Sequence, residues 1–171
     1  GKATDAEFDF TLQILDTANT ISIFVPNLYI ENNTTLKGNY NYTESLQFQL
    51  TSKNLAFKNF VFDDIAINGK ETSGIYNITL TSPKLYNKSI TFLENIKLSL
   101  NTTPKIVQIA LLWNDEIAKN YGDINIDVTN KSGTNYIDIK KSSFGINNEK
   151  WTIDNNNNII LLDSNLLIIK D

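Results

Sequence analysis

The sequence predicts an all-β fold, an antiparallel β-sandwich of the Ig-like or jelly-roll-like kind. A dozen or so short segments alternate apolar and polar residues with a period of two, the pattern of strands with one buried face. Turn-forming residues recur roughly every 8 to 12 positions, and helical periodicity is almost absent. The chain has 171 residues, of which 41% are hydrophobic, so it can bury a core within one domain. Two stacked sandwiches, divided near Pro83 or Pro104, are the alternative.

The first predicted strand, residues 7–16, reads EFDFTLQILD and lies almost at the N-terminus. Its apolar side chains share one side of an extended strand: Phe8, Phe10, Leu12 and Ile14. A polar leader, residues 1–6, precedes it, and a soft linker, residues 17–19, follows. The apolar side must pack either on its own domain or in a groove on a neighbouring molecule. We therefore divide the chain into an N-terminal donor strand and hinge, residues 1–19, and a β-sandwich domain, residues 20–171.

The next predicted strands follow from β-branched and aromatic runs. Residues 20–30 form such a run, in which Pro26 indicates an edge or a bend because proline cannot donate a ladder hydrogen bond. Residues 46–50 alternate cleanly, and residues 55–62 are rich in phenylalanine. Asn68-Gly69 then predicts a tight hairpin turn, since this pair readily adopts positive φ.

Residues 74–82 predict a further strand that Pro83 closes, and residues 95–100 alternate again. Residues 105–113 are apolar on both sides, which predicts a central strand under two layers. Residues 115–120 are the one stretch expected to form a helical turn.

The last third of the chain predicts a hairpin and several short strands. Residues 123–128 and 136–140 alternate on either side of Asn130-Lys131-Ser132-Gly133, a turn sequence. Four consecutive asparagines, residues 155–158, predict a turn between residues 151–153 and the final apolar segments. Those final segments are residues 159–162 and 166–169.

Composition argues against several classes of function. The chain has no His and no Cys, so the usual general base, the commonest metal ligand and thiol chemistry are missing. We expect no enzyme, no cofactor and no metal site. All 15 basic residues are lysine and the pI is about 4.8, which argues against nucleic acid as a partner. No apolar run is long enough to span a membrane, and no signal peptide is visible, so Gly1 is expected to be a mature N-terminus or an expression scar.

Asparagine is abundant, and seven positions fit the Asn-X-Ser/Thr acceptor pattern for N-glycosylation. The candidates are Asn32, Asn33, Asn41, Asn77, Asn87, Asn101 and Asn130. Several fall in predicted turns, where a glycan would be tolerated. Asn77 lies mid-strand and needs a solvated sheet face to carry one. Composition alone is the competing explanation for their number.

Two further groups of side chains have a functional and a structural interpretation. Asp123, Asn125 and Asp127 offer oxygen ligands that suit calcium, but a strand spreads them apart, and a solvated strand face is the favoured explanation. Trp113, Trp151 and the tyrosines could stack on sugar rings. In a sandwich, such aromatics are more often core residues or cross-strand pairs.

The chain resembles secreted filament subunits that polymerise by donor-strand complementation, especially the archaeal thread type. The resemblance rests on the strand that begins Phe8-Asp9-Phe10, on the glycosylation sites, on the absence of cysteine and on the all-β remainder. It implies that the N-terminal strand fills a groove on the next subunit, that glycans coat the surface and that isopeptide links reinforce the fibre. It also implies an extracellular, cell-surface location.

The expected function is a non-enzymatic structural subunit of an extracellular filament, used for adhesion or cell–cell contact. Its expected partners are identical subunits in a head-to-tail polymer, with surface glycans or other cells as possible targets. The alternative is a β-sandwich adhesin or carbohydrate-binding module of a larger surface protein. An accessory jelly-roll domain of a secreted hydrolase is a third option.

Overall fold

The computed structural model describes residues 7–15, 26–41, 45–87, 90–115, 119–131, 133–154, 157–162 and 166–170. These residues form strands and turns, and no helix occurs among them. In chain order the strands are β1 (Glu7–Ile14), β2 (Leu28–Ile30), β3 (Thr34–Asn41), β4 (Ser45–Phe57), β5 (Phe60–Thr72), β6 (Ile75–Asn87), β7 (Ile90–Thr102), β8 (Ile106–Asn114), β9 (Tyr121–Lys131), β10 (Thr134–Ile139), β11 (Ser142–Ile146), β12 (Glu149–Ile153), β13 (Asn157–Leu162) and β14 (Leu166–Lys170).

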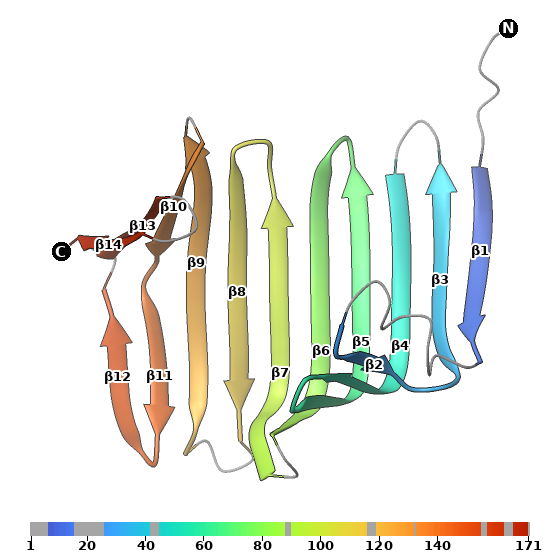
Figure 1. Ribbon diagram of the computed structural model, residues 1–171, viewed down its shortest axis with the longest axis horizontal. Helices are drawn as coiled ribbons and strands as arrows, with labels where there is room; N and C mark the ends of the chain where they lie inside the picture. Colours follow the sequence, from blue (N-terminus) through green and yellow to red (C-terminus); the bar gives the residue numbers. More distant parts are fainter. Residues whose placement is uncertain are drawn as a thin grey trace, which may run out of the picture.

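The strands belong to one antiparallel sheet that runs mostly as a meander (Figure 1). Its order is β1-β3-β4-β5-β6-β7-β8-β9-β10-β13-β14, with β2 paired to β4 and the β11–β12 hairpin paired to β9. This confirms the predicted all-β, antiparallel fold, which is consistent with a sandwich. β1 is the first strand of the order and therefore an edge strand of the chain's own sheet.

The strand registers keep the apolar positions of successive strands on the same side of the sheet. Leu36 on β3 lies opposite both Leu12 on β1 and Leu50 on β4. One residue further along, Lys37 lies opposite Thr11 and Gln49, on the other side. Because directly opposite residues point the same way, the sheet has one apolar face and one polar face.

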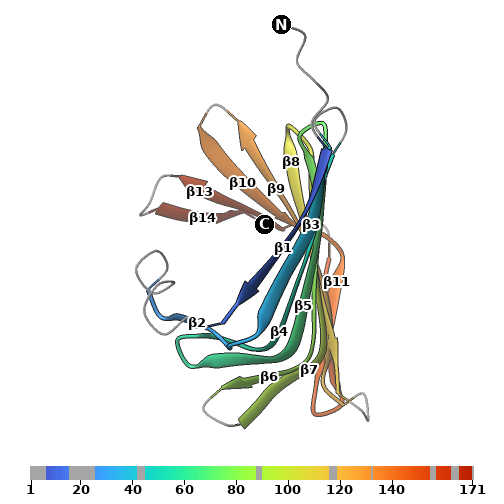
Figure 2. The same ribbon diagram turned by 90° about the vertical axis from the view of Figure 1, so that its right-hand side faces the viewer.

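The sheet bends sharply across β4–β7, and the lower ends of these strands turn toward one side (Figure 2). The ladders are interrupted along a single line of residues, at Lys53, Asp64, Pro83 and Asn95. Asp64 and Asn95 have positive φ values of 41° and 48°, and Pro83 has no N–H to donate. The register is the same on both sides of the line, so these residues bend the strands without shifting their pairing.

The bend creates the small core of the molecule. The apolar side chains that are less than one-tenth exposed are Ile65 (1%), Ile96 (4%), Leu85 (8%) and Ile30 (8%). Ile65 and Ile96 directly follow the bend residues of their strands, and Leu85 lies two residues beyond the bend in β6. Ile30 is on β2, which pairs with the bent end of β4. The two-layer packing expected of a sandwich is therefore present where the ends of the strands fold over.

Buried hydroxyl groups satisfy the backbone where the ladders break. The Ser82 hydroxyl lies 2.5 Å from the carbonyl oxygen of Asp63 and 2.8 Å from that of Lys84. Ser52 donates to the carbonyl of Asn54, at 2.8 Å, and accepts a hydrogen bond from Thr34, at 2.6 Å. Each serine immediately precedes the bend residue of its strand. These buried polar side chains thus stabilise the bend, since an unpaired buried carbonyl is costly.

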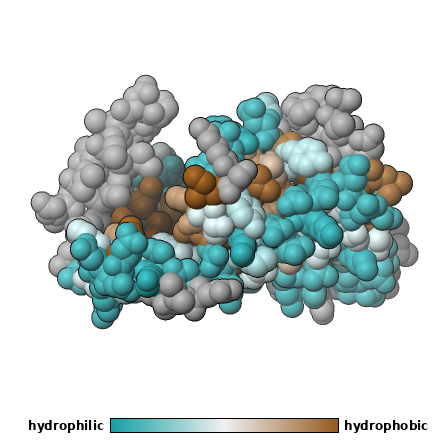
Figure 3. Space-filling view, turned by 90° about the horizontal axis from the view of Figure 1, so that it is seen from below, coloured by the Kyte–Doolittle hydropathy of each residue, from teal (hydrophilic) through white to brown (hydrophobic). Residues whose placement is uncertain are grey.

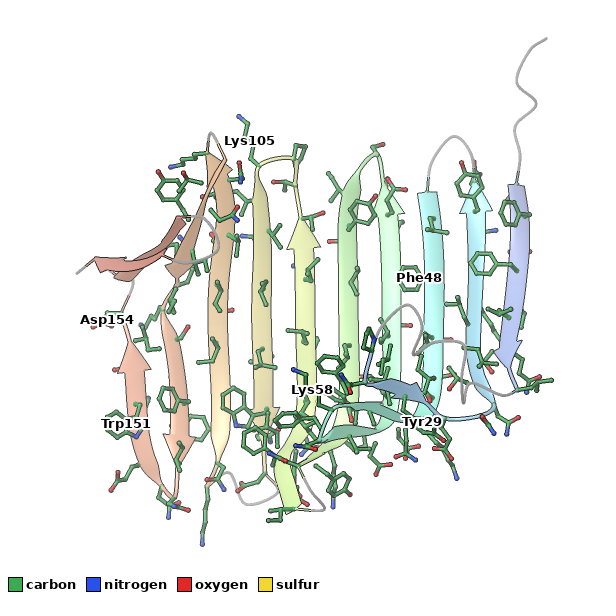
Figure 4. All side chains as sticks on the ribbon, viewed as in Figure 1. Tyr29, Phe48, Lys58, Lys105, Trp151 and Asp154 are labelled. Atoms are coloured by element: carbon green, nitrogen blue, oxygen red, sulfur yellow. The ribbon has the colours of Figure 1, made fainter. Side chains whose placement is uncertain are left out.

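The predicted hairpin at Asn68-Gly69 is wrong. Both residues lie inside β5, and the chain turns instead at Ser73-Gly74, where φ is 52° and 79°. Gly69 lies opposite Phe48, and a Cβ at this position would overlap the Phe48 ring, which lies against the sheet in Figure 4. The glycine is needed here for space under an aromatic ring rather than for a turn.

The structure corrects two further local predictions and confirms a third. Pro83 does not end its strand, because β6 continues through the bend. The strand that contains residues 106–113, β8, is not buried on both sides, since Gln108 is exposed and Leu112 is 39% exposed. The hairpin after Asn130 is confirmed, with Lys131 opposite Thr134. Of the predicted helical turn at residues 115–120, residues 116–118 lie outside the described residues; of the run at residues 20–30, residues 20–25 do, and its end forms β2.

Candidate functional site

The structure places the predicted donor strand, β1, against β3 of the same chain. The ladder covers all eight residues of the strand, from Glu7 opposite Asn41 to Ile14 opposite Thr34. Asn39 donates a hydrogen bond to Asp9, at 2.8 Å, and the Asn33 amide donates to the Ile14 carbonyl, at 2.7 Å. The hinge, residues 17–19, and the leader, residues 1–6, lie outside the described residues.

The apolar side of β1 is largely uncovered. Phe8 is 53% exposed and Leu12 is 55% exposed, whereas Phe10 and Ile14 are half-buried. The Phe8 ring contacts Tyr40, with ring centroids 5.4 Å apart. The main contacts of β1 are with one neighbouring strand, so its attachment rests chiefly on the ladder with β3.

Phe10 has a more specific partner. It lies opposite Gly38, and a Cβ on this glycine would overlap the Phe10 ring. The same arrangement recurs at Phe48 over Gly69 and at Trp113 over Gly122. On each of these pairs, an aromatic ring covers the backbone of the next strand, which protects the ladder from water.

The glycosylation candidates are mostly exposed. Asn32 and Asn33 occupy the turn between β2 and β3, and Asn130 lies at the β9–β10 hairpin, where it contacts Asn135 at 2.8 Å. Asn77 and Asn101 lie opposite each other on the polar face of β6 and β7. Asn41 and Asn87, in contrast, are half-buried. The solvated face that the Asn77 site requires is therefore present.

The acidic residues of β9 take part in an ion-pair network. Asp127 lies directly opposite Asp138 on β10, and Lys140 contacts both carboxylates, with its Nζ atom 3.5 Å from Asp127 Oδ2. The hydrogen bond to Asp138 raises the pKa of Lys140 above its ordinary value, and the charges of both carboxylates add to this effect against partial desolvation. Asp123 accepts a hydrogen bond from Asn125. Across the described ranges, no three acidic side chains come together as a metal site would require.

The two tryptophans have different environments. Trp113 is half-buried over Gly122, whereas Trp151 on β12 is 54% exposed. Trp151 stacks on Phe144, with ring centroids 6.3 Å apart and an interplanar angle of 9°. Both rings, together with Ile146, Asn147 and Glu149, line a shallow hollow at the outer edge of the sheet, where Figure 4 shows Trp151.

Sequence reasoning missed the Lys140 network and the Phe144–Trp151 pair. Lys140 follows Asp138 at the spacing that places two residues on one side of a strand, which is a usable signal for an ion pair. The partnership with Asp127 depends on the β9–β10 register, which the Asn130–Gly133 turn sequence could have supplied. The pairing of Phe144 with Trp151 depends on the β11–β12 hairpin, for which Asn147-Asn148, with φ values of 51° and 70°, is a usable turn signal.

No helix long and apolar enough to cross a membrane is found in the described part of the chain. Comparison with protein-family models, curated proteins and solved structures finds no match to this chain. Function is therefore argued from the chain's own residues.

Proposed function

We propose that the chain is a structural subunit of an extracellular filament, in which β1 is donated to β3 of the next subunit. The observation that carries the proposal is the state of β1: a terminal edge strand that is held by one ladder and leaves Phe8 and Leu12 more than half exposed. Such a strand can leave its own sheet without disturbing the bend core.

Exchange of β1 conserves the interactions that hold it. The same eight-residue ladder and the same Asn39–Asp9 hydrogen bond form whether β3 belongs to the same chain or to another one. Main-chain hydrogen bonds supply the affinity in this kind of strand addition, and alternate side chains supply the specificity. Because each subunit donates at one place and accepts at another, the contact is head-to-tail and propagates an open polymer.

Exposed glycosylation candidates on the polar face and in turns support an extracellular location, since glycans there would not block the β1–β3 ladder. Asn32, Asn77 and Asn101 are exposed and lie outside that ladder. Adhesion or cell–cell contact is the proposed use of the filament. The role is non-enzymatic, in keeping with a chain that has neither His nor Cys.

Truncation with strand replacement tests the proposal. A chain that begins at residue 16 should fail to form filaments in electron micrographs, and a synthetic peptide of residues 1–16 should bind to it and restore its stability. A peptide with Thr11→Pro is the matched control, because it keeps the apolar side chains but proline fixes φ and is poorly tolerated inside a strand. Filaments that still form from the truncated chain, or a full-length chain that never polymerises, would refute strand donation.

A second candidate function is carbohydrate binding at the Phe144–Trp151 pair. The exposed ring of Trp151, stacked on the half-buried Phe144 beside Asn147 and Glu149, offers both a stacking surface and hydrogen-bonding groups. Trp151→Ala should abolish glycan-array signals if this is the binding site. Phe92→Ala, at a side chain that is 59% exposed on β7, is the control. Signals that are absent from the unmodified chain would exclude this function.

A further inference from the structure

The apolar face of the sheet is continuous across eight strands. The registers align a single row of branched aliphatic side chains, one from each of β1, β3, β4, β5, β6, β7, β8 and β9: Leu12, Leu36, Leu50, Ile67, Leu80, Leu98, Leu111 and Ile124. None of these side chains is fully buried, and Leu12 is 55% exposed. Figure 3, seen from below, shows apolar residues in a hollow on this side of the sheet.

The neighbouring row on this face is equally free of charge. It runs through the aromatic and aliphatic residues Phe10, Gly38, Phe48, Gly69, Ile78, Leu100, Ile109 and Ile126. A third row runs through Phe8, Tyr40, Leu46, Glu71 and Tyr76, of which only Glu71 is charged. The three rows together form what we call the apolar face.

The opposite side of the same strands is polar. The row directly behind the aliphatic one consists of Thr11, Lys37, Gln49, Asn68, Thr79, Ser99, Ala110 and Asn125. A sheet with this asymmetry has one side suited to water and one side suited to a second layer. Among the described residues, β2 and the bent strand ends lie over one end of the apolar face, and β10, β13 and β14 project on the same side of the sheet (Figure 2).

The size of the uncovered face indicates what could cover it. Eight strands about 4.8 Å apart and three rows about 7 Å apart span about 700 Å² of sheet. Two such faces in contact would bury about 1,400 Å², which lies in the range of stable protein interfaces, about 1,200–2,000 Å². In the aliphatic row, the seven side chains other than Leu12 are half-buried, so a second layer would complete their burial.

We propose that the apolar face packs against the same face of a second copy of this chain. A single added strand would cover a width of about 5 Å, whereas the face is eight strands wide. A second sheet of equal width would cover all of it, and another copy of this chain has such a sheet. The contact is isologous, the commonest symmetry of homodimers, and no charge in the two central rows opposes it. A net charge of -4 disfavours an anionic lipid surface as the alternative occupant. This pairing uses the face of the sheet and not β1, so it stands or fails independently of strand donation.

The absence of cysteine allows a direct test in the full chain. Leu80 is on β6, near the middle of the aliphatic row, and Thr79 is its neighbour on the polar face. Under mild oxidation, Leu80→Cys should give a disulfide-linked dimer on a non-reducing gel, and Thr79→Cys should not. In light scattering, the unmodified chain should have the mass of two copies or a multiple of it. Leu80→Lys should halve that mass with an unchanged far-UV circular dichroism spectrum, whereas Thr79→Lys should not.

The possible results of these experiments distinguish pairing of two apolar faces from the alternatives. A monomeric mass for the unmodified chain across its soluble concentration range would overturn the proposal, and so would equal cross-linking by the two cysteine variants. A monomer that co-sediments with zwitterionic lipid vesicles would assign the face to lipid instead. If Leu80→Lys does not fold, the cysteine pair still decides the matter. Because Leu80 lies four strands away from β1, a positive cross-link says nothing about strand donation.

Discussion

Two parts of the apolar face have the same sequence pattern and opposite burial. At the bend, Ile65 and Ile96 are 1% and 4% exposed, whereas on the edge strand Phe8 and Leu12 are 53% and 55% exposed. Ile96 and the edge pair both come from segments, residues 95–100 and 7–14, in which apolar residues alternate with polar ones. The difference arises because the bend folds the ends of β4–β7 over the first pair, whereas no second layer among the described residues covers the other pair. Alternation thus determines which side of a strand is apolar, and the tertiary structure determines what covers it.

The largest expected effect tests the buried side of this comparison. Ile65→Ala removes a fully buried side chain from the bend core and should lower the free energy of unfolding by about 2–4 kcal/mol. Leu12→Ala, in the exposed half of the same face, should cost less than about 1 kcal/mol in the monomer. Urea denaturation of the dilute chain measures both. Equal costs at the two positions would mean that the edge strand is buried after all.

A smaller effect is expected where an aromatic ring covers a glycine. Gly122→Ala places a methyl group where the Trp113 ring lies, and overpacking of this kind costs about 1–3 kcal/mol. The displaced indole should also change its fluorescence spectrum. In a Trp113→Leu background, the same glycine substitution should cost much less, since the ring atoms that it would meet are gone. An unchanged penalty in that background would show that the glycine is required for another reason.

The smallest effect concerns the ion-pair network between β9 and β10. Lys140→Gln leaves Asp127 and Asp138 facing each other without their cation, so the variant should unfold at a lower temperature than the unmodified chain at pH 7. The folded-state pKa of Lys140 is raised above 10.5, so its contribution to stability is fully present below pH 10.5 and is lost as the pH rises further. The gap between the two chains should close above that pH. A gap that is constant with pH would contradict this role.

The class of the fold was predictable because alternation in segments such as residues 7–16 and 46–50 survives in the structure, and because the Asn130–Gly133 turn formed as its sequence implies. Pro83 and Asn68-Gly69 were misread for a shared reason. Both signal a turn when they are read in isolation. In the structure, Pro83 lies at the bend of a continuous strand, and Gly69 makes room for the Phe48 ring. Those uses depend on cross-strand neighbours that the local sequence does not contain. The partners of Lys140 and Trp151, in contrast, follow from the registers of hairpins whose turn residues, Asn130–Gly133 and Asn147-Asn148, are present in the sequence.

The central claim is that β1 moves from its own β3 to that of another subunit, and one pairing measures this directly. Thr11 and Lys37 lie opposite each other in the β1–β3 ladder, at a separation that a disulfide can bridge. Thr11→Cys and Lys37→Cys chains are prepared separately, mixed under conditions of assembly and oxidised. Strand donation predicts a disulfide between the two different chains, and it predicts covalent polymers from the double variant. A mixture without inter-chain disulfides, together with a double variant that closes only within single chains, would show that β1 stays in its own sheet.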